Sequence, residues 1–291
     1  MLYDAFLFLN ELEILEIRLH TLYRHVDKFV LVEANQTFST LSSKGTFLFE
    51  ENKHLFKDFL DKIIHIKLEN EFLTTESLKE LPWPQRLKCR LKRTELANQN
   101  ETHHRNSIVR GLCAAEPHDL VLISDIDEII NPECLPEAVE RLKTEPVVGF
   151  EQQLYRYFLN IHEKDSSWTA PRLTTCENAF RTKPHTIRGQ KVPLIRNGGW
   201  HFTCIGNMEK LLYKSQSFLH HDRCYRGEYK DVHNLEILFR ERVIKKGIDI
   251  FDFIDCRYEI VEIDETFPEI IHGNQDRYRE LIFSPEPPPG F

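Results

Sequence analysis

The sequence lacks the glycine-rich motifs with which many nucleotide-binding proteins hold a phosphate. Neither G-x-G-x-x-G nor G-x-x-x-x-G-K-[ST] occurs among its 291 residues, which include 11 glycines. The motif evidence therefore excludes a Rossmann-type dinucleotide site and a P-loop. If the protein binds a diphosphate, a metal ion and basic side chains have to hold it.

Long hydrophobic runs are also missing. No apolar stretch approaches the about 20 residues that a membrane-spanning helix needs. The first residues, MLYDAFLFLNELEILE, carry no basic segment, and Asn10 and Glu11 interrupt their apolar run, so they do not match a signal peptide. We therefore expect no integral membrane segment and a cytoplasmic location.

The seven cysteines form no C-x-x-C pair. An odd, scattered set is typical of reduced thiols in a cytosolic protein. The net charge of −8 argues against the backbone of a nucleic acid as the main partner. With 41% hydrophobic and 29% charged residues, the composition is that of a soluble globular protein.

The first half of the chain alternates strand and helix patterns. Short apolar runs predict strands at residues 3–9, 29–32, 63–68 and 120–123, and helical periodicity predicts helices at 11–23, capped by Asn10, at 51–60 and within 87–115. This β-α-β-α-β-α-β order indicates an α/β fold with a mostly parallel, doubly wound sheet.

The second half is less regular. We predict a helix at residues 136–143, an aromatic strand at 147–159, loops and antiparallel strands over 160–210, and a helix at 231–246 that Asp231 caps and Gly247 ends. The proline-rich end, SPEPPPGF, is expected to be extended. We expect one domain, with a first half at 1–135, a second half with a small antiparallel portion at 136–275, and a tail at 276–291.

Residues 119–133, DLVLISDIDEIINPE, hold the strongest chemical signal. A buried strand ends at Ser124, and Asp125, Asp127 and Glu128 follow it. Unpaired carboxylates are too costly to bury, so they should lie at the carboxyl edge of the sheet, where open α/β folds bind ligands. Asp125 and Asp127 can share one Mg²⁺ or Mn²⁺ whose other ligands are water and phosphate oxygens. The alternative is an ordinary acidic turn.

Two later segments carry further candidates. In NGGWHFTCIGNMEKLLYK (197–214), Trp200 beside a glycine turn could stack on a sugar ring, although core packing is the more common role of such aromatic residues. In SFLHHDR (217–223), His220 and Asp222 could bind a metal or accept a proton, unless the segment is a solvated loop. Arg105, from a basic helical region, and Lys214 are candidates for neutralising a diphosphate.

Four blocks taken together resemble glycosyltransferase family 17: YDAFLFLNELEILEIRLHTLYRHVDKFVLVEANQTFS, LISDIDEIINPE, GGWHFTCIG and SFLHHD. They occur in the same order as in the family and extend from Tyr3 to at least His221. The resemblance implies a GT-A type fold, with 1–135 as the nucleotide-binding half and 136–275 as the acceptor-side half. It also implies a nucleotide-sugar donor such as UDP-GlcNAc, a divalent cation, a glycan acceptor, and inversion at the anomeric carbon. Asp222 stands where the family commonly has Glu, and TFSTLSSK departs from the family pattern after its Thr-Phe-Ser block.

The resemblance also implies roles for individual residues. Asp125 and Asp127 match the Asp-x-Asp of such enzymes, in which one carboxylate holds the metal and the other the ribose or a metal-bound water. His220 matches a late metal-binding histidine. Glu11 and Glu33, at the ends of the first two strands, lie on the side expected for the nucleoside. For the catalytic base we predict Asp222 or Glu209, with His201 as the alternate.

Three other functions remain open. A nucleotidyltransferase would also use paired carboxylates, but it usually has a glycine-rich loop where this chain has Asn10 and Glu11. A phosphatase of the haloacid-dehalogenase type would need Asp-x-Asp-x-Thr after its first strand, and here Ile129 stands in place of the threonine. A carbohydrate-binding protein without catalysis could keep the same scaffold.

Overall fold

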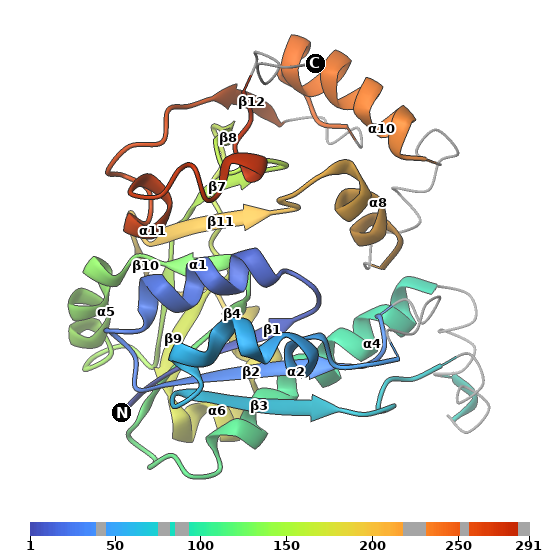
Figure 1. Cartoon of the computed structure of the whole chain (residues 1–291). Coiled ribbons are helices and arrows are strands. Elements are labelled where there is room, and N and C mark those ends of the chain that lie inside the picture. The colour runs from blue at the N-terminus through green and yellow to red at the C-terminus, as the bar shows by residue number, and fades with distance from the viewer. Residues whose placement is uncertain (39–44, 75–81, 85–92, 218–230, 251–255, 285–291) are drawn as a thin grey trace.

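Two β-sheets form the framework of the protein (Figure 1). The structure is a computed structural model, and it describes residues 1–38, 45–74, 82–84, 93–217, 231–250 and 256–284. Among these residues the larger sheet has seven strands, in the order β10-β6-β9-β4-β1-β2-β3. They are β1 (Leu2–Phe8), β2 (Lys28–Ala34), β3 (Ile63–Leu68), β4 (Leu120–Asp125), β6 (Val147–Phe150), β9 (Arg172–Thr175) and β10 (Leu194–Ile195). Only β9 runs antiparallel to its neighbours within this described sheet. The predicted mostly parallel α/β sheet is confirmed.

The smaller sheet is mainly antiparallel and has the order β12-β8-β7-β11-β5. Its strands are β5 (Glu128–Ile130), β7 (Gln153–Arg156), β8 (Ile161–Lys164), β11 (Gly199–Thr203) and β12 (Arg257–Ile260). Strand β5 begins three residues after β4 ends, so the chain passes from one sheet to the other at Asp125–Glu128. The acidic segment found in the sequence therefore lies at the junction of the two sheets.

Helix α1 (Leu12–Leu22) lies between the sheets (Figure 1). Its buried face packs on β1 and β2 through Phe6, Phe8 and Leu31, and on β11 through Trp200 and Phe202. The segments that complete this layer are α2 (Leu48–Asn52), the 3-10 helix η1 (Lys53–Phe59), α11 (Glu269–His272) and η6 (Arg279–Leu281). Burial of this large apolar cluster orients α1 along the junction.

The opposite face of the large sheet packs against η3 (Ser107–Leu112), α6 (Cys176–Thr182) and α7 (Pro184–Arg188), next to α4 (Arg93–Asn106). The short helices η4 (Pro132–Cys134) and α5 (Leu135–Arg141) cover β4 and β6. Beyond the small sheet, α8 (Met208–Ser217), α10 (Val232–Leu238) and the π-helix η5 (Phe239–Ile244) form a third apolar cluster. Within the described residues, no helix combines the length and apolar character needed to cross a membrane.

Several predicted boundaries need correction. The first helix has Glu11, not Asn10, at its N-cap, and the helix expected at 51–60 is divided between α2 and η1, with non-helical φ and ψ angles at Phe56. The strand expected at 147–159 is two strands, because residues 151–152 leave the large sheet for the small one. The end of the chain, 285–291, lies outside the described residues.

The region 160–210 holds two helices where we expected loops and strands. Helix α6 begins because the side chain of Thr175 accepts a hydrogen bond from the Asn178 amide, an ordinary N-cap. Helix α7 begins with Pro184 in its first turn, a position where proline lacks no needed donor. The helix predicted from 231 is confirmed: Asp231 caps it, and Gly247, with a φ of 64°, follows its end.

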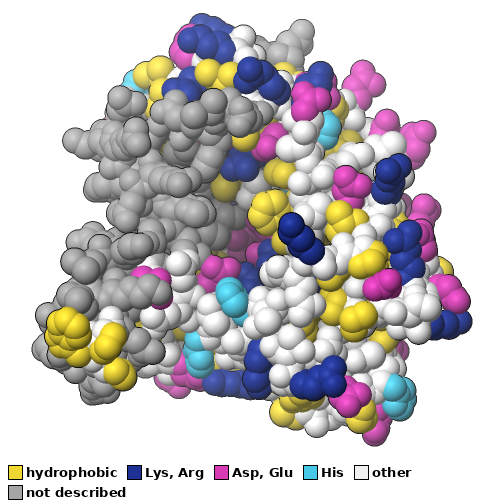
Figure 2. Space-filling view, turned by 180° about the vertical axis from the view of Figure 1, so that it is seen from behind, with side chains coloured by type: hydrophobic (Ala, Val, Ile, Leu, Met, Phe, Trp, Pro, Cys, Tyr) yellow, Lys and Arg dark blue, Asp and Glu magenta, His cyan; other side chains and the backbone are white. Residues whose placement is uncertain are grey.

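On the face in Figure 2, acidic, basic and apolar side chains are interspersed.

Asn35-Gln36-Thr37 and Asn100-Glu101-Thr102 are N-x-[ST] sequences, and both asparagines make buried hydrogen bonds. Asn35 accepts a hydrogen bond from the Asn70 amide (2.9 Å) and is 6% exposed. Asn100, which is 1% exposed, accepts from the Leu73 amide (2.7 Å) and donates to the carbonyls of Phe38 and Leu73. Asn100 thereby ties α4 to two connections at the carboxyl ends of β2 and β3.

We expect Asn100→Ala to lower the free energy of unfolding by about 2 to 3 kcal/mol, because it leaves buried backbone groups without partners. Urea denaturation followed by circular dichroism measures the change. Asn98→Ala, at an exposed position of the same helix, is the matched control and should change stability by less than about 0.5 kcal/mol. Equal losses in the two variants would contradict the role given to Asn100.

Candidate functional site

The acidic turn, residues 125–128, connects the buried strand β4 to β5. Residues 121–124 are fully buried between helices on both faces, and Asp125 is the last residue of the strand. The side chain of Asp125 is 32% exposed and that of Asp127 is 10% exposed, whereas Glu128 is completely buried. Glu128 thus differs from our expectation that all three carboxylates lie at the open edge.

Two arginines hold the carboxylate of Asp125. Arg105 of α4 donates to one oxygen and Arg188 of α7 to the other, each over 2.7 Å. Burial raises the pKa of Asp125, but the two guanidinium groups outweigh it and hold that pKa below its ordinary value. Asp125 is therefore a fixed anion with both oxygens in use.

Glu128 is buried because Arg188 pairs with it as well. Arg188 donates to both of its oxygens, over 2.6 Å to Oε2, and the indole N–H of Trp168 donates to Oε1. Glu128 Oε2 also accepts from the Asp125 amide (2.8 Å). Burial lowers the pKa of Arg188, yet Asp125 and Glu128 together raise it above its ordinary value, so the arginine stays charged.

His201 brings β11 against the turn. It pairs with Glu128 in the register of β5 and β11, and its Nε2 lies 3.5 Å from Asp127 Oδ1. The ring of Trp168 packs over the imidazole with centroids 4.6 Å apart. Among the described residues, the buried Nδ1 atom of His201 has no hydrogen-bond partner. The structure thus brings together Asp125, Asp127, Arg105 and His201 of the predicted site residues.

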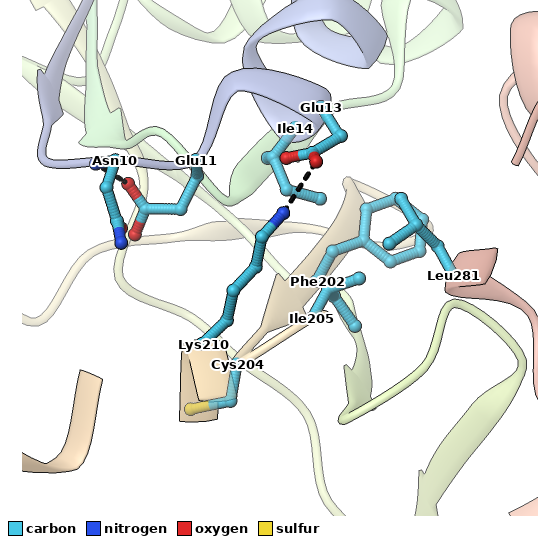
Figure 3. Close-up of a pocket in the computed structure, with 9 residues that line it drawn as sticks. All are labelled: Asn10, Glu11, Glu13, Ile14, Phe202, Cys204, Ile205, Lys210 and Leu281. Atoms are coloured by element: carbon cyan, nitrogen blue, oxygen red, sulfur yellow. Dashed lines mark hydrogen bonds and ion pairs between the residues drawn. The ribbon is translucent and has the colours of Figure 1, made fainter. Parts of the chain in front are cut away.

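A small pocket lies between the β1–α1 loop and the start of α8 (Figure 3). Glu11 lines it, and its carboxylate accepts from the amides of Leu9 and Asn10. Across the pocket Lys210 pairs with Glu13 over 2.5 Å. Glu209, the neighbour of Lys210 in the first turn of α8, is exposed.

The remaining predicted residues lie apart from the turn or outside the described structure. Glu33 is fully buried and accepts from the amides of Leu48 and Phe49, at the start of α2, and faces His65. Trp200 is 8% exposed in the core and donates to the Thr266 carbonyl, which agrees with the core-packing alternative. His220 and Asp222 fall outside the described residues, as does the side chain of Lys214, which is part of α8. Their predicted roles stay predictions.

Sequence reasoning missed Trp168, Arg188 and the buried Arg18 of α1. Lys183-Pro184 is a helix-start signal that could have placed Arg188 on a helix. The pairing of Arg188 with Glu128, however, depends on contacts between residues 60 positions apart. Local pattern carries no information about such a pair.

Among the described residues of the turn, Asp127 is the one whose carboxylate fits a divalent cation. Within the part of the chain that the structure describes, no group of three His, Cys, Asp or Glu side chains could hold a metal. Asp125 is engaged by two arginines, so Asp127 is the carboxylate that would contact the ion. One protein carboxylate is enough for Mg²⁺ or Mn²⁺ when substrate phosphates and water complete the shell.

Comparison with known proteins identifies the chain. The model of the family described as Glycosyltransferase family 17 matches residues 1–276. A search of curated proteins finds no match. Among solved structures, the crystal structure of TarS 1-349 from S. aureus is similar at a TM-score of 0.39 and 10% identity, over 86% of this chain and 76% of that one. A similarity at that score supports no further conclusion.

Proposed function

The chain belongs to glycosyltransferase family 17, and we propose that it transfers a sugar from a UDP-sugar, UDP-GlcNAc by family resemblance, to a hydroxyl group of a glycan, with inversion and on a GT-A type fold. The resemblance inferred from four sequence blocks is thereby confirmed at the level of the family. A glycosyltransferase needs a sugar donor and an acceptor. The identity of both, and the dependence on Mn²⁺ or Mg²⁺, belong to the proposal.

The observation that carries the proposal is the arrangement of the two aspartates. Asp125 ends β4 with both oxygens fixed by Arg105 and Arg188, while Asp127 turns its carboxylate toward His201. A preorganised turn of this kind supplies one carboxylate for a cation without reorganisation at the moment of reaction. When bound, the cation would stabilise the charge that builds on the leaving diphosphate.

The protein's own groups have two further tasks in this proposal. Arg105 and Arg188 set the position and charge of Asp125, which would orient the ribose or a water on the cation. A base has to accept the proton of the attacking hydroxyl on the face opposite the nucleotide. Asp222, Glu209 and His201 are the candidates, and His201 is supported by its contact with Asp127.

The pH dependence of transfer distinguishes these three bases. We expect the variant that removes the base, among Asp222→Asn, Glu209→Gln and His201→Gln, to lose most activity and also the fall of kcat at acidic pH, which arises when the base becomes protonated. If a variant keeps the wild-type pH profile and rate, the residue that it replaces is not the base. If all three variants still lose activity at acidic pH as the wild type does, this assignment is contradicted.

The activity itself is tested with a panel of UDP-sugars, incubated with the protein with and without Mn²⁺. Metal-dependent release of UDP from at least one sugar is the expected result. Release of pyrophosphate from a nucleoside triphosphate would favour the nucleotidyltransferase instead. Sugar binding without release of any nucleotide would favour a carbohydrate-binding protein.

A further inference from the structure

Arg18 is buried completely at the junction of the two sheets. It lies on the inner face of α1, and both it and its partner Asp4 of β1 have side chains with 0% exposure. The guanidinium group binds the Asp4 carboxylate through Nε (2.8 Å) and Nη2 (2.5 Å), and it packs over the ring of Phe6 at 4.5 Å. The charges of Arg18 and Asp4 neutralise each other. The other hydrogen bonds of Arg18 are therefore not needed to balance its charge.

The remaining donors of Arg18 all go to the acidic turn. Nη1 donates to the carbonyls of Asp125 (2.9 Å), Ile126 (3.1 Å) and Glu128 (3.0 Å). Nη2 also donates to the Ser124 hydroxyl (2.6 Å). Three backbone carbonyls of the turn and the Ser124 hydroxyl thus converge on one guanidinium group, whose planar fork has a rigid geometry.

The side chains of the same turn are held from the other direction. Arg105 and Arg188 bind the Asp125 carboxylate, and Arg188 binds Glu128. Asp127 lies between these two anchored residues, and its carbonyl accepts from the Phe202 amide (2.8 Å). Fixing the carbonyls on both sides of Asp127 restricts the φ and ψ angles that determine where its carboxylate points.

Stability alone does not account for this arginine. A buried ion pair can often be replaced by apolar side chains of similar volume without loss of stability. The ring of Phe6 packs on the guanidinium group, and α1 and β1 contribute to one large apolar cluster. An apolar pair would fill the space, but it would leave the carbonyls of the turn without their common donor.

We propose that Arg18 is a positioning residue for sugar transfer, which holds the turn so that Asp127 is presented to the cation and the donor diphosphate. This inference rests on the proposed function, because it concerns the same site. It assigns to α1 a direct part in shaping the site, although Arg18 touches no substrate.

The test is the double variant Asp4→Leu/Arg18→Met, which removes both charges together and keeps most of the buried volume. We expect the variant to fold with a lower melting temperature, because apolar groups can replace the ion pair but three buried carbonyls lose their donor. In the folded variant, kcat should fall at least about thirtyfold, while KM for the UDP-sugar changes less than about threefold. Such a split is the sign of a group that acts in the transition state rather than in binding. A kcat within threefold of wild type would overturn the proposal.

Two more variants keep the test decisive. If the double variant does not fold, Arg18→Lys retains a cation for Asp4 but lacks the planar fork, and it should show the same fall in kcat. Leu22→Ala, which removes a fully buried side chain elsewhere on α1, should lower the melting temperature yet leave kcat unchanged. A similar loss of kcat in Leu22→Ala would show that Arg18 is only structural.

Hydrogen exchange separates this inference from the proposed function. If the wild type transfers no sugar, the proposed function fails, but the exchange of the amides of residues 125–130 still reports on the turn. Faster exchange there in the double variant, with unchanged exchange in β2 and β3, supports the positioning role. Unchanged exchange at residues 125–130 overturns it.

Discussion

Asp127→Asn is expected to lower the rate of sugar transfer by about 10²- to 10³-fold, the range found when a preorganised group that stabilises transition-state charge is removed. Asparagine keeps the shape of the side chain but loses the negative charge. The substitution therefore removes the carboxylate that would contact the cation, while the arginine clamp on Asp125 stays intact. The rate of UDP release at saturating Mn²⁺ measures the effect.

The control for this variant is Asp58→Asn, which makes the same chemical change at an exposed position of η1. It should transfer sugar at the wild-type rate. The melting temperature of Asp127→Asn should stay near that of the wild type, since asparagine fills the same space. Activity of Asp127→Asn within tenfold of the wild type would remove Asp127 from the centre of the reaction.

The parts of the fold that could be predicted are those specified by local pattern. The apolar run 120–123 and the carboxylates after it placed Asp125 at the end of a buried strand, because a charge cannot follow such a run without a partner. Strand β3, at residues 63–68, was predicted to the residue. Capping chemistry likewise placed Asp231 at the start of α10.

The parts that could not be predicted depend on contacts between distant residues. Glu128 has the same local pattern as Asp125, yet it is buried because Arg188, 60 positions later, neutralises it. Arg18 occupies a helical position among apolar neighbours, and the sequence alone does not reveal that Asp4 and the turn complete its bonds. The core of the site is thus a tertiary ion network, which helical or strand periodicity does not encode.

Arg188→Met is the substitution with the largest expected effect on folding. Arg188 is the shared partner of Asp125 and Glu128, so its removal leaves two carboxylates close together in a mostly buried place. Breaking a buried pair by removing one partner costs about 3 to 5 kcal/mol. We expect a loss of that size at pH 7, measured by guanidinium chloride denaturation, together with loss of sugar transfer.

Two comparisons test the cause of that loss. Arg181→Met, at an exposed position of α6, removes the same side chain where no buried carboxylate depends on it, and should change stability by less than about 0.5 kcal/mol. Arg188→Met/Glu128→Gln should be more stable than Arg188→Met alone, because one of the stranded charges is gone. Additive losses in the double variant would contradict a direct coupling between Arg188 and Glu128.

The pH dependence of stability tests whether Arg188 stabilises the fold through its charge. In the wild type the pKa of Asp125 lies below its ordinary value of 3.8 despite burial, because Arg105 and Arg188 lower it. The stability that this carboxylate contributes is therefore present above the ordinary pKa and is lost as the pH falls through the lowered one. In Arg188→Met the folded-state pKa of Asp125 should rise, so the variant gains stability relative to the wild type on acidification. The difference between the two proteins should be largest at pH 7 and should shrink toward pH 4; a difference that stays constant or widens would mean that Arg188 stabilises the fold by packing rather than by charge.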